Sequence, residues 1–204
     1  MRIITVSREF GSGGRELGKR IADNLGCDYY DREILTMIAE KHGLTEEYVE
    51  DMLNRDFVSS IPLTFRTSFA AMDAMADFRT ELLVEQTSII KNIASLGRDC
   101  VIVGRNADII LNDYKTFNVF VCADMEARIA RCKEYSDKHE RLSEKELEKN
   151  IKRIDKERAK SRELIADSQW GDSRAYHLTV NTSGWEIKKL APIVADYAQK
   201  WFER

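Results

Sequence analysis

The chain has 204 residues, of which 43% are hydrophobic and 33% are charged, as in a single water-soluble globular domain. The formal net charge of −3 gives no reason to expect a nucleic-acid partner, so any anionic ligand must be bound by local groups of basic side chains. We expect a cytoplasmic protein with reduced thiols and no membrane partner, because the four cysteines lack metal-type spacing and neither a signal peptide nor a membrane-length apolar run is evident.

The N-terminal segment combines a strand, a glycine-rich turn and a helix. Residues 2–7 (RIITVS) are apolar and β-branched, as in a buried parallel strand, and Leu17, Ile21 and Leu25 recur at helical spacing. Backbone N–H groups of a glycine turn before a helix converge on anions, and the helix dipole favours negative charge there. We therefore predict a phosphate-binding loop, with a turn that binds no ligand as the alternative, and its residues would be Gly11, Ser12, Gly13, Gly14, Arg15 and Glu16.

This loop departs from the P-loop pattern GxxxxGK[ST], in which the lysine contacts the β- and γ-phosphates and the hydroxyl binds Mg²⁺. With Gly13 as the second glycine, Gly14 stands at the lysine position and Arg15 at the hydroxyl position. Arg8 then stands at the first glycine. A second register over residues 13–20 would leave too short a helix, so we prefer the first.

Strand-like and helical segments alternate along the rest of the chain. After Pro62 we expect a long helical zone, and Asp31 could cap the helix that ends near His42. Strands alternating with helices predict an α/β fold with three layers, in which helices flank a parallel sheet on both faces. The expected strands are 27–30, 99–104, 117–122 and 177–181, and the expected helices are 31–42, one from Thr45, 63–96, 124–135, 143–166 and 185–202.

In this order the segments resemble the cytidylate kinase-like family of P-loop proteins, which is similar to the nucleoside monophosphate kinases. Besides the glycine loop, the resemblance rests on residues 29–31 (YYD), 101–105 (VIVGR), 123–131 (ADMEARIAR) and 180–183 (VNTS). It implies ATP and Mg²⁺ as cofactors and transfer of the γ-phosphoryl group to CMP or dCMP. It also implies one P-loop kinase-like domain, 1–204, with a core (1–30, 97–132 and 168–204), a helical monophosphate-binding lobe (31–96) and a helical lid (133–167).

Phosphoryl transfer needs alignment and positive charge, and arginine provides both because its planar fork binds phosphate bidentately. The resemblance implies that Arg105 binds the monophosphate and that Asp31 contacts the pyrimidine nucleotide. It also implies a phosphate contact for Arg131 at the entrance to the lid. The alternatives are solvated arginines for Arg105 and Arg131, and a helix N-cap for Asp31.

The lid helix offers two more candidates, Arg158 and Arg162. The family pattern there is close to RDxxDxxR, and it can be aligned with its first acid at Asp155 or with its first arginine at Arg153. Asp155, Arg158 and Arg162 share one helical face, so we predict the two arginines as phosphate ligands, with an ordinary solvated helix as the alternative.

The sequence departs from a working kinase in three ways, because the loop lysine, the loop hydroxyl and a strand Asp near Mg²⁺ are missing, with Val103 at the last position. Arg15 could supply the missing charge, with Arg8 as a second candidate, and Glu16 or Glu9 could hold Mg²⁺ directly or through water. A catalytically degenerate protein is therefore the alternative function. Such a protein would bind a nucleotide or another phosphorylated ligand and act by conformation or through a partner.

An apolar face after Pro62 is the best signal for an interaction. We expect it to pack in the core, and a contact in a homodimer or with a closing lobe is the alternative because methionine-rich faces adapt to partners. Its residues are Phe65, Phe69, Met72, Met75 and Phe78.

Overall fold

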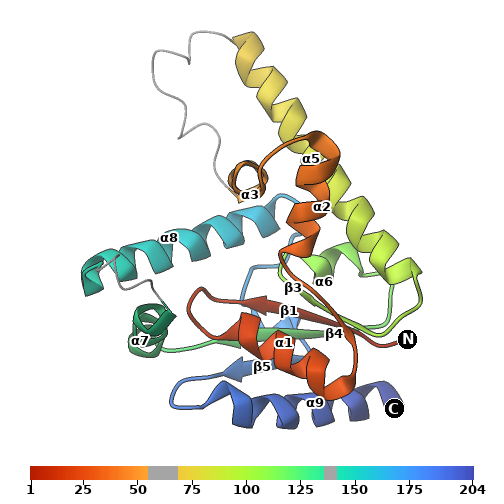
Figure 1. Ribbon diagram of the computed structural model, residues 1–204, viewed down its shortest axis with the longest axis vertical. Coiled ribbons are helices and arrows are strands. Elements are labelled where there is room, and N and C mark those ends of the chain that lie inside the picture. The colour runs from red at the N-terminus through yellow and green to blue at the C-terminus, as the bar shows by residue number, and fades with distance from the viewer. Residues whose placement is uncertain (55–68, 136–141) are drawn as a thin grey trace.

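The computed structural model describes residues 1–54, 69–135 and 142–204. Its centre is a five-stranded parallel sheet in the order β2-β3-β1-β4-β5, with β1 in the middle (Figure 1). The predicted α/β architecture is confirmed. The strands are β1 (Ile3–Arg8), β2 (Asp28–Tyr30), β3 (Cys100–Val103), β4 (Thr116–Cys122) and β5 (Leu178–Asn181).

Alternate residues of the central strand face two different cores, as the period of two along a strand requires. Ile4 and Val6 pack with helices α1 (Gly14–Leu25) and α9 (Ile187–Glu203). Ile3 packs on the opposite side, in the core that four other helices share. These helices are α2 (Glu33–His42), α3 (Glu46–Asn54), α5 (Phe69–Ser95) and α6 (Ala107–Ile110).

Two further helices border the end of the sheet where the glycine loop lies. Figure 1 shows α8 (Glu144–Glu163) between α7 (Met125–Tyr135) and α3. Ser143 and Glu146 form a reciprocal capping box at the start of α8, which fixes where this helix begins. No helix in the described ranges is both long enough and apolar enough to cross a bilayer.

The structure decides two details that the sequence left open. Helix α1 begins at Gly14, and Gly13 has a left-handed backbone (φ 79°), so the second register of the loop is wrong. Asp31 is not a helix cap, because α2 has Arg32 at its N-cap and the Asp31 carboxylate pairs with Arg15 instead.

The apolar face after Pro62 is described only in part. Phe65 and the side chains of Phe69 and Met72 lie outside the described residues. Phe78 packs against the core and contacts the ring of His42 edge-on, with 6.2 Å between the ring centroids.

Candidate functional site

Three predicted site residues follow three neighbouring strands of the sheet. Arg8 ends β1, Asp31 follows β2 and Arg105 comes two residues after β3. Because all the strands are parallel, their carboxyl ends meet at one edge, where open α/β sheets bind their ligands. The topology therefore brings residues from distant parts of the chain to one place.

Two side chains bind backbone carbonyls of the glycine loop. Thr182 donates its hydroxyl hydrogen to the carbonyl of Ser12 at 2.6 Å, and Arg131 donates to the carbonyl of Gly11 at 3.3 Å. Gly11 and Gly13 both have left-handed backbones, which glycine adopts without strain. With its carbonyls bound from outside, the loop keeps the N–H groups at the start of α1 available for an anion.

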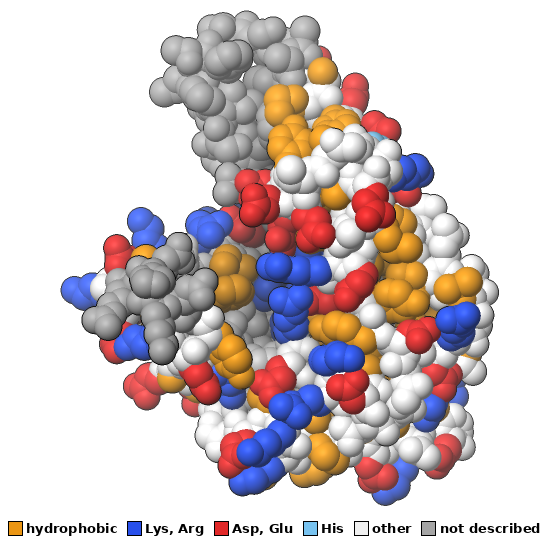
Figure 2. Space-filling model, viewed as in Figure 1, with side chains coloured by type: hydrophobic (Ala, Val, Ile, Leu, Met, Phe, Trp, Pro, Cys, Tyr) orange, Lys and Arg blue, Asp and Glu red, His pale blue; other side chains and the backbone are white. Residues whose placement is uncertain are grey.

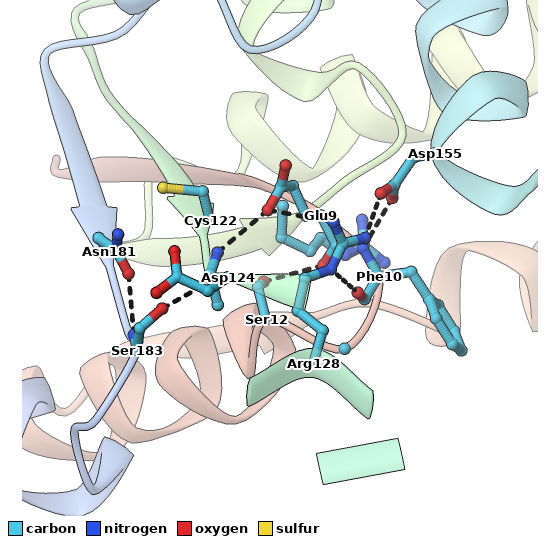
Figure 3. A network of polar contacts seen from close by, with 12 residues as sticks. Glu9, Phe10, Ser12, Cys122, Asp124, Arg128, Asp155, Asn181 and Ser183 are labelled. Carbon is cyan, nitrogen blue, oxygen red and sulfur yellow. Dashed lines mark hydrogen bonds and ion pairs between the residues drawn. The ribbon is translucent and has the colours of Figure 1, made fainter. Parts of the chain in front are cut away.

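A network of charges ties the loop to α7 and α8 (Figure 3). Arg128 donates to the carbonyl of Phe10 at 2.7 Å and pairs with the carboxylates of Glu9 and Asp155. Asp155 in turn accepts a hydrogen bond from the backbone N–H of Phe10 at 2.8 Å. Glu9 also accepts from the backbone N–H of Ala123, at 3.0 Å. No sequence pattern indicated this role for Arg128, although the residue lies in the 123–131 segment.

Two cavities open at this edge of the sheet, and Figure 2 shows Lys and Arg side chains gathered in the hollow, with Asp and Glu beside them. The larger cavity, of about 810 Å³, is bordered by the glycine loop, Arg15, Glu16 and Arg131. The smaller cavity, of about 320 Å³, is bordered by Gln86 and Trp170. Seven residues border both cavities and mark where they meet: Arg8, Phe10, Arg32, Glu50, Arg105, Ile154 and Arg158.

Arg105 lies at this meeting point with an unusual backbone conformation and an incompletely paired side chain. Its backbone is left-handed (φ 57°), which is uncommon for a residue other than glycine. Its side chain is only 8% exposed, and Nη2 lies 3.3 Å from a carboxylate oxygen of Glu50. Its Nε is buried and has no hydrogen-bond partner among the residues that the structure describes. Such an unpaired donor favours binding of an anion.

Arg158 reaches the same place from α8. Its Nη1 donates to the backbone carbonyl of Arg8 at 2.9 Å, and Asp155 lies 3.9 Å away. Burial and the nearby positive charge of Arg8 lower the pKa of Arg158. Burial also lowers the pKa of Arg8, and Arg105 adds to this while Asp31 opposes it. The cluster therefore carries positive charge that an anionic ligand would stabilise.

Arg15 and Glu16 border the larger cavity at the first turn of α1. Arg15 is 56% exposed, and its Nε lies 2.5 Å from a carboxylate oxygen of Asp31. Glu16 accepts from Arg20 at 2.7 Å and from the hydroxyl of Tyr135 at 3.4 Å. Across the described ranges, no group of three or more His, Cys, Asp and Glu side chains is placed to hold a metal ion. Mg²⁺ usually binds only one or two protein carboxylates, and nucleotide phosphates and waters complete its coordination. The single carboxylate of Glu16 meets this requirement.

Arg162 does not reach either cavity. Its guanidinium is 1% exposed and pairs at 2.7 Å with Asp108, which is 2% exposed. It also donates to the carbonyl and hydroxyl of Ser168. The inner face of α8 continues past the cavities into the protein interior at this point, which is why Arg162 serves as a buried structural partner there. The predicted phosphate contact of Arg162 is therefore corrected.

A five-stranded parallel sheet flanked by helices, with a glycine loop between its central strand and the following helix, is an α/β kinase-like fold. The chain belongs to the cytidylate kinase-like family, whose family model matches residues 3–184. Among proteins with curated functions, none matches this sequence.

Solved structures agree on the fold. An uncharacterized protein from Eubacterium ventriosum is similar with a TM-score of 0.70 and 23% identity, over 98% of this chain and 99% of that one. Shikimate kinase from Bacteroides thetaiotaomicron has a TM-score of 0.56 and 15% identity, over 97% and 98% of the two chains. Shikimate kinase from Acinetobacter baumannii, in complex with shikimate, has a TM-score of 0.53 and 17% identity, over 98% and 94%.

Proposed function

We propose that the protein is a phosphotransferase that transfers the γ-phosphoryl group of ATP to a nucleoside monophosphate, with CMP or dCMP as the preferred acceptor. The observation that carries this proposal is the meeting of two cavities at Arg8, Arg105 and Arg158. A phosphoryl donor and an acceptor need adjoining sites with positive charge between them. The family membership of the chain supports the same reaction.

In this proposal ATP occupies the larger cavity. The N–H groups at the start of α1 would bind its phosphates, and Arg15 and Arg131 border the same cavity. Glu16 would hold Mg²⁺ through water, and that ion would neutralise part of the phosphate charge. Residues 133–167 would act as the lid over this site.

The acceptor would occupy the smaller cavity, within a lobe formed by residues 31–96. Arg105 would bind the acceptor phosphate, because its buried Nε has no hydrogen-bond partner among the described residues and its side chain borders both cavities. Asp31 borders the larger cavity and not the smaller one. Its proposed contact with the pyrimidine acceptor would therefore be made where the acceptor reaches into the larger cavity.

The chemistry is an in-line exchange of one P–O bond for another. An oxygen of the ionised acceptor phosphate attacks the γ-phosphorus, and the bond from that phosphorus to the β–γ bridging oxygen breaks. The electron pair of the broken bond stays on the β-phosphate, so ADP and a nucleoside diphosphate form and no proton is transferred. The arginines at the meeting point would stabilise the charge on the transferred group.

The missing loop lysine supports a second candidate, a catalytically degenerate protein that binds a nucleotide and acts by conformation or through a partner. Gly14 and Val103 stand where a kinase has its lysine and an Asp, and Arg15 is already paired with Asp31. In either case we propose a cytoplasmic protein, and a homodimer remains a proposal that rests on the apolar face after Pro62.

A coupled assay of ADP release separates the two candidates. ATP and Mg²⁺ would be supplied with CMP, dCMP, UMP, AMP or GMP, and the binding of ATP and CMP would be measured by isothermal titration. Turnover that is selective for CMP or dCMP is the expected result. ATP binding without turnover for any acceptor would contradict the kinase and support the degenerate protein.

A further inference from the structure

The side chain of Arg8 fills the space that a lysine at position 14 would need. A Cβ atom built on Gly14 would lie 2.4 Å from Cβ of Arg8 and 3.0 Å from its Cγ. Cβ of Arg8 is attached directly to the backbone and cannot swing away as the end of a long side chain could. Arg8 and a lysine at position 14 therefore exclude each other, so the loss of the first loop glycine and the loss of the lysine form one coupled change.

The guanidinium of Arg8 is directed back over the end of the sheet. Its Nη1 lies 1.6 Å from the position that a Cβ on Gly104 would take, which only a glycine permits. Its Nη2 lies 3.5 Å from a carboxylate oxygen of Asp31, which Arg15 also binds. Gly14 and Gly104 thus leave room for this side chain, and Asp31 pairs with its guanidinium.

Arg8 is better placed than Arg15 to replace the missing lysine. Arg8 borders both cavities and its side chain is 16% exposed, whereas Arg15 borders only the larger cavity and is 56% exposed. Two of the other arginines of the meeting point act on Arg8, since Arg158 donates to its carbonyl and the charge of Arg105 acts on its guanidinium.

We propose that Arg8 is the catalytic cation of the transfer step and contacts the γ-phosphoryl group as this group passes from the triphosphate to the acceptor. This inference rests on the proposed function. The bonds broken and formed are those given above, and Arg8 stabilises the charge on the non-bridging oxygens without donating a proton. An arginine performs this task well because it stays charged and offers two parallel donors.

The first test compares substitutions in the full chain, with folding checked by circular dichroism. Arg8→Gln is expected to lower kcat by on the order of 10²–10³, as loss of a transition-state contact does. Arg15→Gln is expected to lower it less, and Lys19→Gln, on an exposed side chain of the same helix paired with Asp23, serves as the matched control. A kcat of Arg8→Gln within threefold of the wild type, or a larger loss in Arg15→Gln, would overturn the proposal.

A rescue variant gives a readout that a merely structural role of Arg8 would not produce. Arg8→Gly combined with Gly14→Lys restores the GxxxxGK pattern over residues 8–14 and removes the clash with Arg8, which leaves Cβ of Val121 3.2 Å from the new Cβ. This double variant is expected to be at least tenfold more active than Arg8→Gly alone. A folded double variant no more active than Arg8→Gly would overturn the equivalence of Arg8 with the loop lysine.

Isothermal titration with ATP and ADP separates failure of this inference from failure of the proposed function. If Arg8 contacts the γ-phosphate, the wild type binds ATP more tightly than ADP and Arg8→Gln loses that preference. This measurement needs no turnover, so it remains decisive even if no acceptor is phosphorylated and the proposed function falls. An equal preference in the two proteins, or none in the wild type, would overturn the role of Arg8.

Discussion

The carboxylate of Asp155 on α8 accepts a hydrogen bond from the backbone N–H of Phe10 at 2.8 Å and so connects this helix to the glycine loop. The same carboxylate pairs with Arg128, which in turn donates to the carbonyl of Phe10 (Figure 3). The position of the loop and that of α8 therefore depend on each other, although 145 residues separate the two partners.

Asp155→Ala tests this connection. The substitution leaves the N–H of Phe10 without its acceptor, so local opening of the loop becomes easier and amide exchange at Phe10 accelerates. We expect exchange at least tenfold faster at Phe10, measured by NMR, with unchanged exchange at Ile4 in the central strand. Glu157→Ala, which removes the partner of Arg153 on the same helix, is the matched control. Equal exchange at Phe10 in both variants would contradict the connection.

The buried pair of Arg162 and Asp108 predicts a large effect on stability. Arg162→Met leaves the Asp108 carboxylate buried without its partner, and such a loss destabilises a protein by about 3–5 kcal/mol. The free energy of unfolding, measured with urea, is the test. Arg162→Met together with Asp108→Leu is expected to lose less than the single substitution, because no buried charge is then left unpaired. Arg174→Ala, on an exposed pair with Asp172, should leave stability unchanged.

The sequence predicted the layers of the fold because its strand and helix patterns are local. The strands, the capping box at Ser143 and the glycine loop were all found where periodicity and turn residues placed them. Arg162 could not be placed in this way. It shares a helical face with Arg158, and only the tertiary structure shows that one end of this face meets the cavities while the other meets Asp108.

The steric exclusion between Arg8 and a lysine at position 14 could not be predicted from the sequence either. The two residues are six positions apart, and the motif showed only that the first loop glycine and the loop lysine were replaced. Their coupling appears once the turn brings Cβ of Arg8 against the backbone of α1. A pattern of residue types gives spacing along the chain, whereas this relationship depends on a distance across the turn.

We expect Arg105→Gln to weaken the binding of the acceptor selectively. If its guanidinium binds the acceptor phosphate, KM for the monophosphate should rise by at least tenfold while KM for ATP changes little. Arg174→Gln is the control, because that side chain is exposed, pairs with Asp172 and borders neither cavity. Initial rates at varied acceptor and ATP concentrations give both constants. A rise in KM for ATP alone would assign Arg105 to the donor instead.

Cys132 provides a reporter for the larger cavity. Its Sγ lies 3.1 Å from the position of a Cβ on Gly11, so a nucleotide bound at the loop would cover it. Burial raises the pKa of this thiol, and the reactive thiolate is therefore a minor species at neutral pH. Alkylation should be slow at pH 7 and accelerate as the pH rises toward the raised pKa.

ATP is expected to slow the alkylation of Cys132 by more than tenfold, followed by mass spectrometry of peptides at fixed pH. Cys27 is the internal control, because burial also raises its pKa but it lies beyond the far end of α1, away from the loop. Since both thiols gain thiolate as the pH rises, the ratio of their rates with and without ATP separates cover by the nucleotide from titration. Equal protection of both cysteines would indicate a general tightening of the fold and would place the nucleotide elsewhere.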